Sequence, residues 1–180
     1  MKETKLYNMI LPPFILFTIP NMLWPISVIG NFIIDSLVII ATLFVLKKLS
    51  ADAYKKAILR IWLWGYVSDV IGAGVLLITS TISSVILDFS KIDPDSSLGR
   101  ILYGMDCVVN HSHFDSMWGV LLVILGILFA AISIFIFDYN LVFKKHLSDV
   151  LSKKQMIIVS LSMAIFTAPY TFLLPKELFY

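Results

Sequence analysis

The sequence predicts an all-α fold, a polytopic membrane helical bundle with five transmembrane helices. Hydrophobic residues make up 59% of the 180 residues and charged residues 14%, against roughly 45–50% and 25% in soluble globular proteins. The mean hydropathy is +0.91. Long apolar runs and the acidic residues inside them are the other two observations behind this prediction.

Four apolar runs each come close to or exceed the roughly 20 residues that a helix needs to cross a hydrocarbon core of about 30 Å. They cover residues 25–46, 61–87, 117–137 and 156–174. The second run is longer than one crossing requires, so we expect it to tilt or to extend beyond the membrane.

A fifth apolar run covers residues 9–24. Joined to the next run it would make one helix of about 57 Å, at 1.5 Å per residue, which is too long for one crossing. Pro20 and Pro25 mark the place where the chain should bend, because proline removes a backbone donor. We favour a helical hairpin and hence five spans. The alternative is four spans plus one re-entrant or interfacial N-terminal helix.

Residues 1–180 are expected to form a single integral membrane domain. The sequence contains no phosphate-binding loop, no GxGxxG and none of the GxSxG or HExxH motifs of hydrolases,. Nucleophilic catalysis therefore finds little support, and any uphill transport would use an ion gradient or a partner's ATPase. The single cysteine, Cys107, excludes an internal disulfide,.

The distribution of lysine and arginine predicts the orientation, because cytoplasmic loops carry an excess of both. Residues 47–60 hold five of them and residues 138–154 hold four, whereas residues 88–115 hold only Lys91 and Arg100. The first two loops are therefore expected in the cytoplasm and the third outside, in a plasma membrane. The basic loops fit anionic lipid headgroups, and nucleic acid is not an expected partner.

Asp35 and Asp69 each lie well inside an apolar run. A charged side chain at the centre of a spanning helix costs roughly 2.5–3.5 kcal/mol, so such residues usually face protein or water. Counted from the nearest basic residues, both lie about 14–18 Å deep at 1.5 Å per residue. Asn31 shares the helical face of Asp35 at 100° per residue and is expected as a neutral ligand beside the two acids.

Two interpretations of these acids remain open. At close range two carboxylates cannot both ionise cheaply, which suits proton coupling or cation binding. The alternative is that each acid only forms a hydrogen bond between helices and stabilises their packing.

A second polar cluster lies in the outer connection. Its predicted metal ligands are Asp106, His111, His113 and Asp115. Histidines and carboxylates at this spacing could bind Zn²⁺ or another divalent metal, or could line the outer entrance of a path to the acids. The alternative is a solvated loop in which Asp115 caps the following helix.

Three further features predict packing and local structure. Gly119, Gly126 and Ser133 recur every seven residues and indicate a close-packed face,. Pro169 predicts a kink in the last span. Asp138, at the end of its apolar run, is expected to be solvated.

The favoured function is movement of a small solute, proton or cation across the membrane, by this chain alone, as a homo-oligomer or as a subunit of a larger complex. The alternative is a non-transport accessory, assembly or immunity membrane protein. A membrane-embedded metalloenzyme that uses the histidine cluster is the least favoured class.

Overall fold

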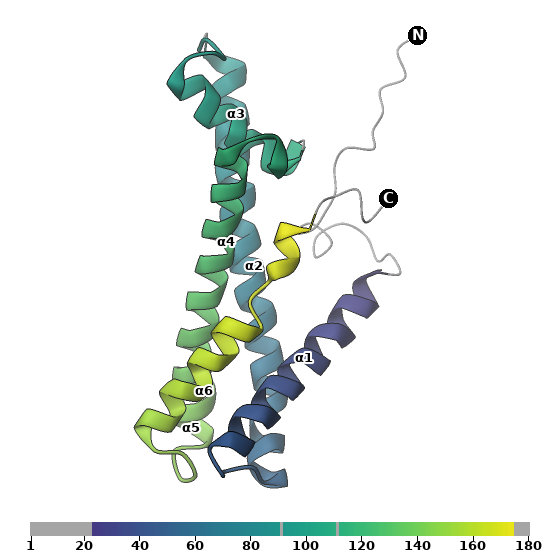
Figure 1. Cartoon of the computed structure of the whole chain (residues 1–180), viewed down its shortest axis with the longest axis vertical. Helices are drawn as coiled ribbons and strands as arrows, with labels where there is room; N and C mark the ends of the chain where they lie inside the picture. Colours follow the sequence, from purple (N-terminus) through teal and green to yellow (C-terminus); the bar gives the residue numbers. More distant parts are fainter. Residues whose placement is uncertain (1–22, 91, 111, 175–180) are drawn as a thin grey trace. The chain divides into compact units, whose positions relative to one another are not determined.

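The computed structural model describes residues 23–90, 92–110 and 112–174 of the chain (Figure 1). These residues are helical, with no strand among them, which confirms the predicted all-α class. The α-helices are α1 (Leu23–Val45), α2 (Ala51–Phe89), α3 (Ser97–Asn110), α4 (Met117–Phe137), α5 (Lys144–His146) and α6 (Lys153–Phe166). Two 3₁₀ segments, η2 (His113–Asp115) and η4 (Tyr170–Leu173), and one π-helical segment, η3 (Asp138–Phe143), connect or extend them.

Four helical stretches of the described chain are long and apolar enough to cross a membrane, namely Val28–Val45, Ala51–Phe89, Met117–His146 and Lys153–Leu173. They correspond to the four long runs seen in the sequence. The predicted fifth helix, at 9–24, falls almost wholly on residues outside the described part, so the count of five stays a prediction.

The helices expose many large apolar side chains, while several acidic side chains are buried. On α1, Ile29, Ile33, Leu37 and Phe44 are all exposed, whereas Asp35 is buried. A soluble protein rarely exposes so many large apolar residues on one surface. In lipid the same surface carries no hydration cost, so this pattern is consistent with an integral membrane protein.

The described chain divides into two compact units, and α2 and α4 each contribute to both. We call residues 23–71 and 128–169 the acidic unit, because it contains Asp35, Asp69 and Asp138. Residues 72–127 and 170–174 form the α3 unit.

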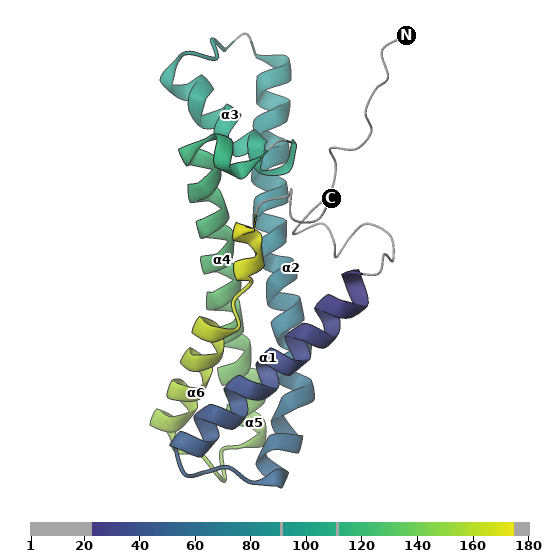
Figure 2. The same cartoon turned by 45° about the vertical axis from the view of Figure 1, so that its right-hand side comes forward.

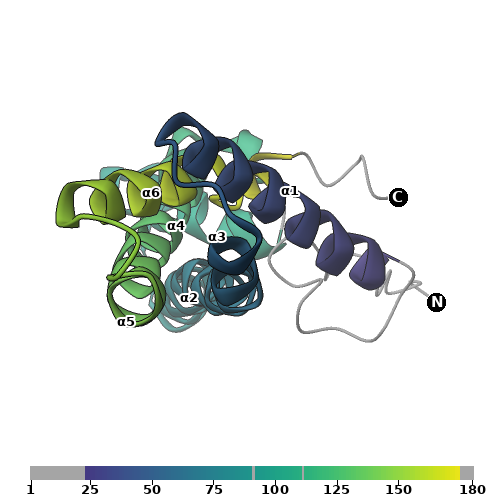
Figure 3. The ribbon, with the colours of Figure 1, turned by 90° about the horizontal axis from the view of Figure 1, so that it is seen from below.

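The acidic unit is built from α1, the first half of α2, the end of α4 with η3 and α5, and α6. Within it α1 and α6 lie side by side (Figures 2 and 3). Its core consists of large apolar side chains that are fully or almost fully buried: Ile39, Leu43, Ile61, Ile134, Val142, Phe143, Leu147, Val159 and Met163.

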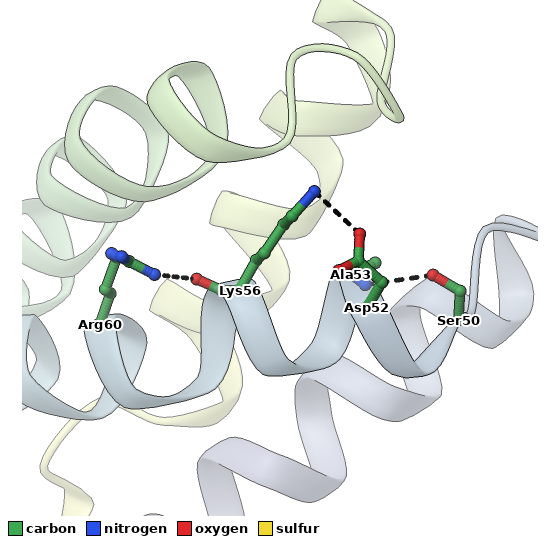
Figure 4. Close-up of polar contacts among 5 residues, drawn as sticks. All are labelled: Ser50, Asp52, Ala53, Lys56 and Arg60. Carbon is green, nitrogen blue, oxygen red and sulfur yellow. Dashed lines mark hydrogen bonds and ion pairs between the residues drawn. The ribbon is translucent and has the colours of Figure 1, made fainter.

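A tight turn joins α1 to α2. Lys47 adopts a left-handed backbone, with φ of 55°. The N–H of Lys48 donates to the carbonyl of Leu43 and the N–H of Lys47 to that of Phe44, each at 2.9 Å, which is the Schellman pattern that ends a helix. The next helix begins with a cap, because Ser50 Oγ accepts a bond from the N–H of Ala53 at 3.1 Å (Figure 4),.

The predicted loop at 47–60 is mostly helix. Asp52 stands in the first turn of α2, where a negative charge suits the helix dipole, and Lys56 Nζ lies 2.8 Å from its carboxylate (Figure 4),. At 39 residues, α2 is about 58 Å long at 1.5 Å per residue, well beyond the hydrocarbon core. The predicted loop at 138–154 is likewise half helical, since η3 and α5 continue α4 to His146.

The α3 unit contains a helix that the sequence did not reveal. Serine side chains of α2 fasten α3, because Ser80 Oγ donates to the Asp106 carbonyl at 3.1 Å and Ser84 Oγ donates to the Asp106 carboxylate. Gly126 of α4 packs against Leu76, where an added Cβ would lie 2.6 Å from that side chain. The predicted close-packed face therefore includes Gly126. It also includes Gly119, where an added Cβ would lie 2.7 Å from the His113 carbonyl oxygen.

The predicted kink at Pro169 agrees with the structure. The helix α6 ends at Phe166 and the 3₁₀ segment η4 begins at Tyr170. Thr167 Oγ1 donates to the Met163 carbonyl at 2.8 Å, so it satisfies one carbonyl of the last helical turn before the proline.

Candidate functional site

The predicted acids of α1 and α2 meet in one helix interface. Asn31 and Asp35 lie one turn apart on α1, and Gly65 and Asp69 lie one turn apart on α2. Asn31 faces Asp69, to which it donates a hydrogen bond, and Asp35 faces Gly65, whose added Cβ would lie 3.7 Å from Asp35 Oδ2. The two helices are antiparallel here, so these pairs form two successive layers of one contact.

Two other contacts place α1 against α2 in the same antiparallel sense. Tyr54 donates its hydroxyl proton to Ser36 Oγ at 3.0 Å, and Trp62 Nε1 donates to the Val28 carbonyl at 3.2 Å. From the first contact to the second, the position on α1 moves back by eight residues, from Ser36 to Val28. The position on α2 moves forward by eight residues, from Tyr54 to Trp62. Gly65 lies directly opposite the Asp35 carboxylate, at a distance where an added Cβ would make an ordinary van der Waals contact.

Asp69 is only partly satisfied. Its side chain is 8% exposed, and its Oδ2 accepts the single long hydrogen bond from Asn31 Nδ2, at 3.3 Å. Among the described residues Oδ1 has no hydrogen-bond partner. Burying a carboxylate oxygen without a partner costs free energy. A role in helix packing through the bond to Asn31 therefore does not by itself explain why an aspartate stands at this position.

Asp35 is 5% exposed. In the part of the chain that the structure describes, it accepts no hydrogen bond and has no ion-pair partner. It faces Gly65, which lies one turn from Asp69 on α2, so the two acids are neighbours along the same helix contact. The predicted pairing of Asp35, Asp69 and Asn31 thus corresponds to one buried cluster.

No cation balances this cluster among the described residues. The one ion pair found there joins Lys56 to Asp52, near the start of α2, where both side chains are largely exposed. Two buried carboxylates that lack a basic partner cannot both carry a charge cheaply. The cluster can therefore hold at least one proton.

Asp138 corrects one expectation, because it is not solvated. Its side chain is 0% exposed, and neither carboxylate oxygen has a hydrogen-bond partner among the described residues. The preceding residue, Phe137, stacks against Trp64 of α2 with ring centroids 5.1 Å apart. Asp138 therefore lies beside the turn of α2 that carries Gly65.

The π-helical segment η3 explains how Asp138 is buried. The N–H of Lys144 donates to the carbonyl of Tyr139, five residues earlier, and such i→i+5 bonding widens the turn. Asp138, Val142 and Phe143 are then buried together on one side. In the same segment Asn140 Nδ2 donates a hydrogen bond to the Ile136 carbonyl at 2.9 Å. π-Turns of this kind occur frequently at functional sites.

The outer cluster is less open than the sequence suggested. Asp106 is 9% exposed and bonded to α2, and His113 is 1% exposed, with its ring 4.1 Å from that of Phe114. Asp115 is exposed and closes a capping box with Ser112 on η2. The α4 helix is capped instead by Ser116, whose Oγ accepts from the N–H of Trp118 at 3.2 Å.

The predicted metal site gains no support from these positions. Within the described ranges no group of three or more His, Cys, Asp or Glu side chains is placed to hold a metal ion. His111 lies outside those ranges, so the divalent metal stays a prediction.

An apolar recess of about 310 Å³ lies beside α1 and α2 in the acidic unit. None of the three buried acids lines it. Its wall consists only of apolar and aromatic residues: Val28, Trp62, Leu63, Tyr66, Val67 and Val70. The three acids therefore lie outside this recess.

Comparison of the chain with protein families, with curated proteins and with solved structures finds no match. Any function must therefore be argued from the buried acids themselves.

Proposed function

We propose that this protein moves protons across a membrane, with Asp35 and Asp69 as the proton-carrying groups and Asn31 as a neutral ligand of Asp69. The observation that carries the proposal is the burial of two carboxylates in successive layers of the α1–α2 contact, with no basic partner among the described residues. Ionisable residues inside a membrane are costly and typically mark ion pathways or proton relays.

The contacts around the acids favour a proton over a larger solute. None of the acids lines the apolar recess, and a solute or hydrated cation needs a cavity with several polar groups. A proton needs only a carboxylate oxygen that can accept it. Both Asp69 Oδ1 and the Asp35 carboxylate provide such an oxygen, because neither accepts a hydrogen bond from the described residues.

The orientation proposed for the protein follows the basic residues. The turn between α1 and α2 and the turn between α5 and α6 would face the cytoplasm, and α3 would lie outside, in a plasma membrane. The charge bias supports this arrangement, since residues 47–60 hold five Lys or Arg and residues 88–115 hold two.

The test of the function is proton flux in vesicles that contain the purified protein. A potassium gradient with valinomycin drives the flux, and a pH-sensitive dye inside the vesicles reports it. We expect acidification faster than in protein-free vesicles, and the same rate for Asp52→Asn, which alters an exposed aspartate in an ion pair. Equal rates with and without the wild-type protein, at either sign of the potential, would contradict the proposal.

The orientation can be tested with cysteines placed on both sides of the membrane. Ser97 and Ser148 are both exposed, and no side-chain hydrogen bond is found for either among the described residues. In a chain carrying Cys107→Ala, a membrane-impermeant thiol reagent added to intact cells should label Ser97→Cys and not Ser148→Cys. After the cells are opened both should react. Labelling of Ser148→Cys alone in intact cells would reverse the orientation.

A further inference from the structure

Asp138 is a third buried acid of the acidic unit, besides Asp35 and Asp69. It is more completely buried than Asp35 or Asp69, at 0% exposure against 5% and 8%. Both of its oxygens lack a hydrogen-bond partner among the described residues. An unpaired carboxylate in such a place is expensive, and no packing role explains it, because it donates to and accepts from none of its described neighbours.

The helix contacts place Asp138 and Asp35 at the same level of the acidic unit. Trp64 of α2 stacks on Phe137, next to Asp138, and the following residue, Gly65, faces Asp35. Along α2 the three acids follow one another, because Trp64 contacts Phe137, Gly65 faces Asp35, and Asp69 lies one turn further on. Asp35 is therefore the middle member of a series of three acids.

The three acids also lie at different distances from one end of the unit, where α1 ends, α2 begins and α5 ends. Asp138 precedes His146 by eight residues, Asp35 precedes Val45 by ten, and Asp69 follows Ala51 by eighteen. At 1.5 Å per residue, Asp69 lies about 27 Å along α2 from Ala51, and Gly65, the residue that faces Asp35, lies about 21 Å from it,. Asp138 is the nearest to this end and Asp69 the deepest.

We propose that Asp138 is the third proton-carrying group of the protein and connects Asp35 with the end of the acidic unit that faces the cytoplasm. This inference rests on the proposed function. Each transfer moves one proton from the carboxylic acid of one residue to a carboxylate oxygen of the next, so no charge is created within the membrane. The order from the deep end is Asp69, Asp35, Asp138.

Several ionisable groups other than Asp35 lie on the elements around Asp138, and Asp138 is bonded to none of them in the described part of the chain. No hydrogen bond or ion pair joins Asp138 to the other titratable residues on η3 or on the elements packed against it, within the described ranges. Those residues are Tyr139 on η3, Lys144, Lys145 and His146 on α5, Lys153 and Lys154 on α6, and Asp52, Tyr54, Lys55, Lys56, Arg60, Tyr66 and Asp69 on the first half of α2.

The flux assay separates this inference from the proposed function. Asp138→Asn should reduce proton flux to the level of protein-free vesicles, whereas Asp138→Glu, which keeps the carboxyl group, should retain flux. Flux in Asp138→Asn that equals the wild-type rate, while Asp35→Asn has none, would overturn the role of Asp138 and leave the function intact. Helix content by circular dichroism and elution on size exclusion show that the variants are folded.

An infrared measurement tests the coupling without any transport. The C=O band of a protonated Asp138 should be absent from Asp138→Asn and shifted in frequency in Asp138→Glu, and the second variant assigns the band if the first does not fold. Asp35→Asn should change the pH at which this band disappears, and Asp52→Asn should not. No such band at any pH, or a band that ignores Asp35→Asn, would overturn the inference even if the protein moves protons.

Discussion

Asp35→Asn and Asp69→Asn should each reduce proton flux to the level of protein-free vesicles while leaving the protein folded. Asparagine nearly preserves the shape of aspartate and can still accept the bond that Asn31 Nδ2 donates to position 69. It cannot take up or release a proton near neutral pH. Flux under an imposed potential, measured at equal protein content per vesicle, gives the comparison.

The same two positions test the packing alternative. If the acids only hold helices together, the asparagine variants should be nearly silent in every assay. Asp35→Leu and Asp69→Leu should then destabilise the protein by on the order of 1 kcal/mol, the scale of hydrogen bonds between helices in membranes. A double asparagine variant that still conducts protons would refute the carboxylate mechanism.

Asn31 provides a milder perturbation of the same site. It supplies the one hydrogen bond that Asp69 accepts from the described residues, so its removal leaves a buried carboxylate with no donor. The distinction between Asn31 and the acids is chemical, since Asn31 cannot carry a proton and should tune the flux without being required for it.

The pairing of Asn31, Asp35 and Asp69 was predictable because local periodicity is sufficient for it. Asn31 and Asp35 are one helical turn apart, and a short turn between the helices makes them antiparallel neighbours of Asp69,. The depth of each acid within its apolar run then limits which residues can meet.

Asp138 was missed because its burial depends on contacts far apart in the sequence. It follows the last apolar residue of its run and is succeeded by Tyr139 and Asn140, a pattern typical of a helix end in water. The π-helical turn that places it inside involves a change of hydrogen-bond partner, and side-chain hydropathy does not report such a change. One signal was present, namely an acid directly adjoining an uninterrupted apolar run.

The extension of α2 and the presence of α3 were missed for a different reason. The charged residues of 51–60 were read as loop, although Ala53 and Ala57 form a buried face there. In α3 the apolar residues are too few for a span, yet Leu102, Cys107 and Val108 are buried. Short helices outside the membrane core are stabilised by such packing, which a search for long apolar runs does not detect.

A large effect on stability is expected from the substitution of Gly119, which lies in the α3 unit. A Cβ added at Gly119 of α4 would lie 2.7 Å from the His113 carbonyl oxygen and 2.9 Å from that of Gly104. Both obstacles are backbone atoms, which cannot move without displacing η2 or α3. Gly119→Ala should therefore destabilise the protein by about 1–3 kcal/mol, the usual cost of overpacking.

Gly74 of α2 is the matched control, because it lies in the same unit and in a helix, and no atom lies within 4 Å of an added Cβ. Gly74→Ala should stabilise the protein by about 0.5–1 kcal/mol, since alanine favours the helix interior more than glycine does. Thermal unfolding in detergent, followed by circular dichroism, should move in opposite directions for the two variants. If Gly119→Ala were as stable as Gly74→Ala, α4 could not pack against η2 and α3 as closely as described.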